Sequence, residues 1–372
     1  MSETMTRQYE PGTHPDMPPP NLASGPLFWL KKNLFSTPLN TILSLLAIYF
    51  LWKTIPPILD WVVLDAVTEA SSRKECRELG QGACWAFIID RFSILMYGFY
   101  PEPERWRVNS AFILMIVAML PILFDNVPHR KYGLIYSCIY PFLAGWLLLG
   151  GFGLTPVTTD QFGGMMLNTL VGVTGIAFSL PIGILLALGR QSHMPIVRSI
   201  CVCFIEFIRG VPLITLLFVA STMLNYFLPP GTHFDLLLRV LIMVTLFSAA
   251  YMAEVIRGGL QAIPKGQFEA GDSIGLKYWQ QMRLVILPQA LKISIPGIVN
   301  TFIGLFKDTT LVLIIGMLDI VGVTRSSLAD ATWNGLAYEG YVFIAIFFFI
   351  ACFAMSRYSL YLEDKLHTGH KR

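Results

Sequence analysis

Long apolar runs, each followed by a polar segment, fill the chain from residue 38 onward. An α-helix rises about 1.5 Å per residue, so about 20 apolar residues cross the roughly 30 Å hydrocarbon core of a bilayer. About eight runs approach that length. The pattern predicts an all-α integral membrane protein with transmembrane helices near residues 38–58, 108–124, 132–154, 165–188, 202–227, 236–260, 293–317 and 341–360.

Lys and Arg are unevenly distributed among the loops that join these runs. The loops after the third and fifth runs carry neither, and the loop after the seventh carries only Arg325. Short loops rich in Lys and Arg stay in the cytoplasm, so both termini are predicted to be cytoplasmic. The loops assigned to the cytoplasm contain Arg130, Lys131, Arg190, Arg198, Arg257, Lys265, Lys277, Arg283 and Lys292.

The loop at 53–107 is about 55 residues long, near the length at which the charge rule stops applying, and we expect it to be periplasmic. Two of the six cysteines, Cys76 and Cys84, lie in this polar loop, whereas the other four lie in apolar stretches. Their spacing suits a local disulfide, which persists in an oxidising compartment. Cysteine usage and charge distribution therefore place this loop on the same side.

The chain divides near residue 158, where widely spaced spans give way to closely spaced ones. The first residues lack the basic segment and apolar run of a signal peptide, and their proline and polar content is typical of disorder. The predicted organisation is a disordered cytoplasmic tail at 1–36, a three-helix extension at 37–157, a five-helix core at 158–366 with a cytoplasmic loop at 261–290, and a C-terminal tail at 367–372.

Composition supports the membrane assignment and excludes several other classes. Hydrophobic residues make up 54% of the chain and charged residues 14%, well below the roughly 25% charged content of soluble proteins. The net charge of +3 is small and its basic residues are scattered, so nucleic-acid binding has no support. The sequence has no phosphate-binding loop, metal-ligand cluster or nucleophile motif. We therefore expect no metal, cofactor or catalytic site in this chain.

Charged pairs recur near the cytoplasmic ends of the fifth and sixth spans. In "FIEFIRGVPLI", Glu206 and Arg209 share a helix face just before Pro212, which predicts a break in the helix. Glu254 and Arg257 repeat the same spacing. These pairs are candidates either for structural ion pairs that hold a broken helix against its neighbour or for groups along a translocation path.

Lys307 and Asp308 lie deeper, about 21 Å into the seventh span. A charge at that depth costs at least ~2.5 kcal/mol unless it meets partners or water. The two side chains project about 100° apart, so they cannot face the same way. Either a buried ion pair with another helix or a role along a solute pathway would explain them.

The loop at 261–290 contains an unusual arrangement of small, acidic and aromatic residues. "KGQFEAGDSIG" reads as a short helix closed at Gly275 by left-handed geometry. "KYWQQMRLVI" reads as a second short helix, which Pro288 is predicted to end. Phe268, Tyr278 and Trp279 would leave apolar surface in the cytosol, which indicates a partner protein.

These residues match a family signature. Glu269, Ala270 and Gly271, then Gly275, then Leu287 and Pro288, resemble the EAA-x3-G-x9-I-x-L-P motif of bacterial ABC importer permeases. The chain departs from the motif at Gly271, where Ala is usual, and at Val285, where Ile is usual. The resemblance implies that the loop forms coupling helices docked in a groove on an ATPase.

Other segments narrow the resemblance. "EFIRGVPLI", "VILPQALKISIPGIVNTF" and "KDTTLV" are similar to polar amino-acid importer permeases, over about residues 163–366. "CRELGQGACWAFI" resembles the larger permeases of general L-amino-acid importers. That family implies a heterodimer of two related permeases, two ATPases that bind ATP and Mg, and a periplasmic amino-acid-binding protein.

The expected function is therefore that of a non-catalytic permease subunit of an ATP-driven amino-acid importer. Lys307 and Asp308 match a family motif, but we do not assign them as substrate ligands. The alternative is an ion-coupled secondary amino-acid transporter with Lys307, Asp308 and Glu254 as coupling charges. We expect the long external loop to help receive the binding protein.

Overall fold

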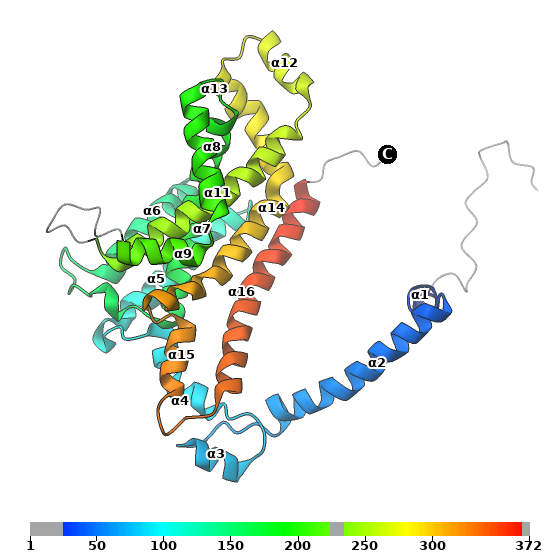
Figure 1. Cartoon of the computed structure of the whole chain (residues 1–372), viewed down its shortest axis with the longest axis vertical. Coiled ribbons are helices and arrows are strands. Elements are labelled where there is room, and N and C mark those ends of the chain that lie inside the picture. The colour runs from blue at the N-terminus through cyan, green and yellow to red at the C-terminus, as the bar shows by residue number, and fades with distance from the viewer. Residues whose placement is uncertain (1–24, 224–233, 367–372) are drawn as a thin grey trace, which may run out of the picture. The chain divides into compact units, whose positions relative to one another are not determined.

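A computed structural model describes residues 25–223 and 234–366, and these residues are almost entirely helical (Figure 1). The chain forms two compact units. The first comprises Met1–Val67 with Leu79–Ala83, and the second comprises Thr68–Glu78 with Cys84–Arg372, each considered over its described residues. Each unit is described by itself.

The first unit contains helix α1, Pro26–Asn33, and helix α2, Pro38–Leu59, which a π-helical turn extends over Asp60–Leu64. The Ser44 hydroxyl donates to the Leu34 carbonyl at 2.8 Å and fixes the corner between them. The prediction of disorder over 1–36 is wrong for α1, because Pro26 is compatible with a first helical turn and an apolar segment follows it. Residues 1–24 lie outside the described residues.

Helix α2 has no buried residue in this chain, although its side chains are predominantly apolar. A helix that is hydrophobic all round belongs in lipid or against another apolar helix. Within the first unit, therefore, most of this span is uncovered.

In the second unit, helices α5, Arg105–Leu123, and α6, Arg130–Leu149, form a hairpin. Hydroxyl groups on α6 donate to backbone carbonyls of α5: Ser137 to Ala118 at 2.6 Å, and Tyr140 to Ala111 at 3.0 Å. Buried in an apolar setting, such bonds satisfy polar groups that have no water. They hold the two extension helices as one element.

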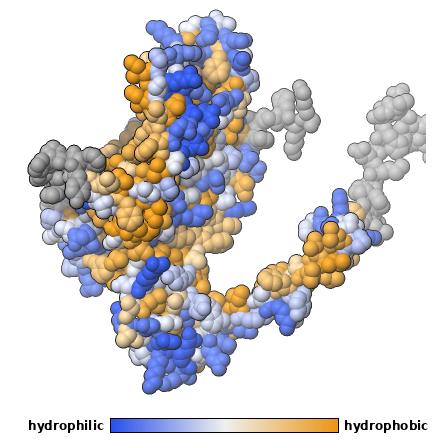
Figure 2. All heavy atoms as spheres, viewed as in Figure 1, coloured by the Kyte–Doolittle hydropathy of each residue, from blue (hydrophilic) through white to orange (hydrophobic). Residues whose placement is uncertain are grey.

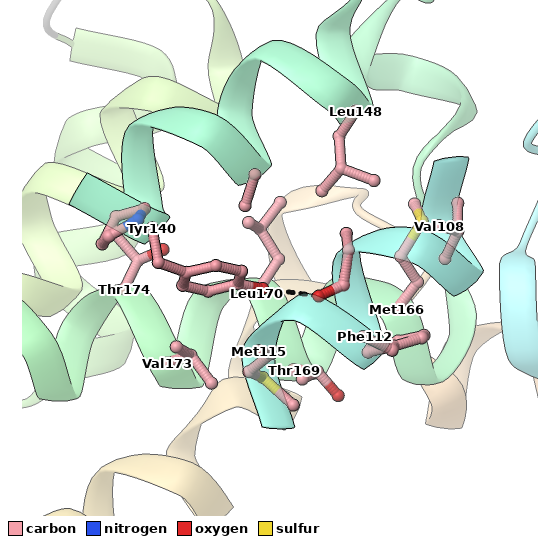
Figure 3. Close-up of a pocket in the computed structure, with 13 residues that line it drawn as sticks. Val108, Phe112, Met115, Tyr140, Leu148, Met166, Thr169, Leu170, Val173 and Thr174 are labelled. Atoms are coloured by element: carbon pink, nitrogen blue, oxygen red, sulfur yellow. Dashed lines mark hydrogen bonds between the residues drawn. The ribbon is translucent and has the colours of Figure 1, made fainter. Parts of the chain in front are cut away.

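The hairpin packs on helix α7, Gly164–Gln191. A small apolar cavity of about 40 Å³ lies where the three helices meet, with Val108, Phe112, Tyr140 and Leu170 among its lining side chains (Figure 3). The lining side chains are predominantly apolar and come from all three helices. The extension is thus attached to the core through an apolar contact.

The core surrounds α7 and helix α11, Leu236–Gln261. Glycines allow close packing: a Cβ on Gly172 would lie 2.7 Å from the Phe306 ring, and one on Gly183 would lie 2.7 Å from the Met252 Cβ. Small residues at such positions let membrane helices approach closely. The remaining core helices are α8, Pro195–Gly210, α9, Leu213–Phe218 with a π-helical turn at Val219–Met223, α14, Leu287–Asp308 with a 3-10 segment at Thr309–Ile315, α15, Ile320–Leu328, and α16, Ala337–Leu366.

Seven described helices are long and apolar enough to cross a membrane, and the bent pair α8 and α9 raises this number to eight. The pair turns by 104° between Gly210 and Leu213, which confirms the predicted break before Pro212. The end of the fifth predicted span, at 224–227, lies outside the described residues. The membrane fold predicted from the sequence is therefore correct.

Within the second unit, apolar surface covers the middle of the bundle and polar surface gathers at its two ends (Figure 2). Figure 1 places helices α12, Lys265–Ser273, and α13, Tyr278–Gln281, at one end. Helices α3, Arg73–Leu79, and α4, Ala86–Tyr97, lie with α15 at the other end (Figure 1). The polar ends match the two faces of a bilayer.

Candidate functional site: a helical elbow and an ion-pair cluster

Helices α12 and α13 and the turn between them, residues 265–281, form a compact elbow. Helix α12 ends where Gly275 adopts a φ of 76°. The Gly275 amide donates to the Asp272 carbonyl at 3.0 Å, and the Leu276 amide donates to the Gly271 carbonyl at 3.1 Å. This bonding pattern is the glycine-terminated helix end that the sequence predicts.

Gly271 sits against Gln281, which is 5% exposed. A Cβ on Gly271 would lie 2.3 Å from the Gln281 side-chain nitrogen, which instead donates to the Phe268 carbonyl. Gln281 thus fills the space that the missing methyl group leaves. This contact explains why the chain carries Gly at a motif position where Ala is usual.

A second glutamine braces the elbow against the following helix. The Gln289 amide donates to the Gln267 side-chain oxygen at 3.1 Å, so α14 is bonded directly to α12. Sequence reasoning missed both Gln281 and Gln289, because a glutamine in a polar loop carries no local sign of burial. Only the fold brings them beneath α12.

Pro288 does not end the second helix, so that prediction is wrong. A π-helical turn at Met282–Ile286 joins α13 to α14, and Tyr278–Ile315 forms a single helical run of 38 residues. Pro288 lies in the first turn of α14. Proline is tolerated there because its missing N–H needs no partner within the helix. The elbow and the seventh span are therefore mechanically continuous.

The exposed surface of the elbow is apolar at its tip. Ile274 is 75% exposed and Trp279 66% exposed, and the motif residues Glu269 and Ala270 are exposed beside them. Phe268 was also expected to be exposed, but it is half-buried and packs against the apolar core of α8 and α11. Exposed large side chains at a polar end of the molecule are typical of a protein-binding surface.

A cluster of ion pairs lies over that same core. The Glu254 carboxylate accepts three guanidinium groups, from Arg190 at 3.0 Å, Arg209 at 3.3 Å and Arg257 at 2.8 Å. Arg190 also pairs with Glu206 at 2.7 Å. The pairs connect α7, α8 and α11.

Glu254 is the centre of this cluster because its side chain is only 14% exposed, whereas Glu206 is 54% exposed. Arg209 also lies over the Tyr251 ring at 5.6 Å. Removing one partner from a poorly hydrated group of ion pairs leaves an uncompensated charge, which is costly. The cluster therefore fixes the bent α8 against the two long helices.

The surroundings of Lys307 and Asp308 do not match a buried ion pair with another helix, which is one of the two interpretations of these residues. Lys307 is exposed and Asp308 is half-buried. Within the described ranges no ion pair joins either residue to another helix, so the buried cross-helix pair is not found. Their role along a solute pathway stays a prediction.

A buried polar network that the sequence did not reveal anchors the end of the seventh span. The buried Asn168 amide donates to the Thr309 hydroxyl at 3.0 Å and to the Asp319 carboxylate at 3.2 Å, and its oxygen accepts the Ile320 amide at 2.9 Å. Burial raises the pKa of the Asp319 carboxyl group. The network ties α7, α14 and α15 together at the end opposite the elbow.

Cys76 and Cys84 are joined by a disulfide, with their Cα atoms 5.9 Å apart. The bond lies with α3 and α4, at the end of the second unit opposite the elbow (Figure 1). The two ends of the bundle thus carry different chemistry.

The multi-span helical bundle, with an exposed elbow continuous with a membrane helix, has the architecture of a membrane permease. The chain belongs to the family of inner membrane components of binding-protein-dependent transport systems, whose profile matches residues 179–368. It is therefore a multi-pass protein of the inner membrane.

Two curated relatives are similar over nearly the whole chain. The inner membrane amino-acid ABC transporter permease protein YhdY of Escherichia coli is 50% identical, covering 96% of this chain and 97% of the relative. The glutamate/glutamine/aspartate/asparagine transport system permease protein BztC of Rhodobacter capsulatus is 45% identical, covering 95% and 96%. A crystal structure of an amino acid ABC transporter with histidines aligns at 28% identity and a TM-score of 0.48, covering 54% of this chain and 91% of its own.

Proposed function

We propose that this chain is the permease subunit of an ATP-driven importer that carries amino acids inward across the inner membrane. The observation that carries the proposal is the elbow, in which Glu269, Ala270, Gly271 and Gly275 occupy the coupling motif. Relatives named as amino-acid permeases support the substrate class.

The subunit works with partners of three kinds. A second, related permease completes a heterodimeric pathway, two ATPase copies bind ATP and Mg, and a periplasmic binding protein delivers the amino acid. The exposed tip of the elbow, at Ile274 and Trp279, supplies a surface that such a partner would cover. Both termini of the chain are cytoplasmic in this arrangement.

Coupling is mechanical and needs no reaction on the substrate. An ATPase binds the elbow at its exposed tip and at the face that carries Glu269, Ala270 and Gly275. Because α13 continues into α14, which begins at Leu287, movement of the elbow displaces the seventh span with it. Two permeases then alternate between outward and inward openings.

The ion-coupled alternative loses its strongest candidate group. An ion-coupling carboxylate must be free to exchange a proton or cation, whereas Glu254 holds three guanidinium groups. We therefore assign Glu254, with Arg257, Glu206 and Arg209, a structural role at the cytoplasmic ends of the core helices.

Affinity purification from native membranes, followed by reconstitution, tests the proposal. The preparation should contain an ATPase and a second permease, and vesicles should accumulate labelled amino acid only when ATP and the binding protein are both supplied. The same vesicles with this chain alone should accumulate none. Uptake by the lone chain, driven by an ion gradient, would contradict the proposal.

Substrate breadth is tested in the same vesicles. We propose a broad range of L-amino acids, so labelled leucine and histidine should be imported as well as glutamate. Import restricted to glutamate, glutamine, aspartate and asparagine would contradict the broad range and favour the narrower specificity in the name of BztC.

A further inference from the structure

An open cavity of about 500 Å³ lies at the end of the second unit opposite the elbow. Its walls come from α3 and from the segment that joins α15 to α16. The side chains that line it include Arg73, Lys74, Arg77, Glu78, Thr332 and Asn334. This end is the one predicted to be periplasmic. The cavity needs both parts of the chain, because α3 belongs to the extension at 37–157 and the other wall belongs to the core.

Positive charge dominates the cavity. Among the lining side chains, Arg73, Lys74 and Arg77 are exposed and oppose one exposed carboxylate, Glu78, a formal charge of 3 − 1 = +2, which the buried Glu339 paired with Arg77 reduces to +1. The other carboxylate of α3, Glu75, stays charged but is not among the lining side chains: the Ser71 hydroxyl and the Ser71 amide, the latter at 2.7 Å, donate to it and lower its pKa. Lys74 takes part in no ion pair among the described residues, so its charge is available to a ligand.

The basic wall is fixed to the core rather than carried on a free loop. The Arg73 amide donates to the Thr332 carbonyl at 2.9 Å. The Arg73 guanidinium lies where a Cβ on Gly335 would stand, 2.5 Å away, and Gly335 has a φ of 87°. A residue with a side chain would be strained there and would displace Arg73.

A buried carboxylate, Glu339, holds the same segment at the start of α16. Glu339 is 1% exposed, accepts the Cys84 amide at 3.3 Å and lies 3.9 Å from the Arg77 guanidinium. The disulfide joins Cys84, whose amide donates to Glu339, to Cys76, the residue before Arg77. Disulfide and carboxylate together hold α3 against the membrane helix.

Helix α4 adds two further contacts. The Arg91 guanidinium pairs with Asp330 at 2.6 Å, and the buried Trp333 indole donates to Asp90 at 2.9 Å. We call these contacts, with those of Glu339, the external clamp. The external clamp therefore connects α3 and α4 to the segment between α15 and α16 and to the start of α16.

We propose that this basic cavity, Arg73, Lys74 and Arg77 with Glu78, receives an acidic side chain on the surface of the periplasmic binding protein. The inference rests on the proposed function and specifies where that partner docks. Complementary charge steers partners together and fixes their register. The size of the cavity accommodates a whole side chain, and the external clamp connects the docking point to the membrane helices.

Binding of the purified binding protein to the full complex in nanodiscs tests this inference, at about 50 and 300 mM salt. Lys74→Glu should weaken binding roughly tenfold at low salt and flatten its salt dependence, whereas Glu78→Lys should tighten binding. Lys131→Glu makes the same charge change on the predicted cytoplasmic side and should leave the affinity unchanged. Co-purification of all subunits verifies that each variant is assembled.

Wild-type affinity and salt dependence in Lys74→Glu would overturn the inference, as would weaker binding in Glu78→Lys. In either case ATP-driven import by the wild-type complex would leave the proposed function intact. If the wild-type complex neither binds a binding protein nor contains an ATPase, the proposed function itself fails. The two failures are therefore distinguishable.

Discussion

At the scale of single residues, the elbow depends on one close contact. Gly271 and Gln281 are matched in size, since any Cβ at 271 would overlap the Gln281 amide. The motif alone could not reveal this pair, because it presents Gly271 as a departure from a family pattern. The partner that makes the departure necessary lies ten positions later and is recognised only in three dimensions.

Gly271→Ala should therefore destabilise the elbow by about 1–3 kcal/mol, because the methyl group displaces Gln281 from the Phe268 carbonyl. Gln281→Ala should remove most of that penalty when the two changes are combined. A double-mutant cycle on thermal unfolding and ATP-driven uptake measures the coupling. Additive effects of the two substitutions would show that the contact does not matter.

Asp330 gives the external clamp a dependence on pH. Hydrogen bonds from Thr332, together with the Arg91 guanidinium, hold the pKa of the Asp330 carboxyl below its ordinary value. A depressed pKa means that this carboxylate stabilises the fold above its unfolded pKa, about 3.9, and that the contribution is lost as the pH falls through the folded value.

Between about pH 5 and pH 3, the melting temperature of the complex should therefore fall by more in the wild type than in Asp330→Asn. Thermal unfolding scans at a series of pH values across this range measure the difference. Other carboxylates contribute equally to both proteins, so the difference between the two curves reports Asp330. Identical curves would exclude a role for its ionisation.

At the scale of helices, the sequence was sufficient to predict where helices bend or end, whereas continuity between helices and contacts with distant helices became visible only in the structure. Pro212 and Gly275 act on their own backbone, so sequence was sufficient to place the bend after α8 and the end of α12. Pro288 and Phe268 were misjudged, because one is accommodated in a first helical turn and the other is covered by distant helices. Helix α1 was missed because its short apolar stretch directly follows a segment rich in proline and polar residues.

The ion-pair cluster gives a prediction at this scale. Glu254→Gln leaves three arginines without their shared carboxylate and should destabilise the packing of α8 on α7 and α11 by about 2–4 kcal/mol. Glu206→Gln removes one well-exposed pair and should cost at most about 1 kcal/mol. Thermal unfolding of the assembled complex compares the two. Equal effects would mean that Glu254 is not the centre of the cluster.

At the scale of the whole molecule, the spans and their number followed from apolar length, and the described helices agree. The orientation stays a prediction that rests on charge asymmetry and on the disulfide at the end opposite the elbow. Partner surfaces were only partly predictable: the coupling motif announced the elbow, but the basic cavity needs two segments more than 250 positions apart, at Lys74 and Thr332.

Single-cysteine labelling checks the orientation. In a chain that keeps its disulfide and carries Ser in place of the free Cys138, Cys201, Cys203 and Cys352, Ser273→Cys on the elbow should react with a membrane-impermeant thiol reagent only from the cytoplasmic side. Asn334→Cys, on the wall of the basic cavity, should react only from the periplasmic side. The opposite pattern would reverse the assignment of both docking surfaces.

The central claim is that the elbow is the mechanical contact through which a partner ATPase drives transport. Its most direct test is simultaneous measurement of amino-acid uptake and ATP hydrolysis in vesicles that contain the complex with Ile274→Asp and Trp279→Asp. Both side chains are largely exposed, so the permease itself should stay folded. We predict that uptake and binding-protein-stimulated hydrolysis are lost together as the ATPase dissociates; uptake at the wild-type rate would contradict the account.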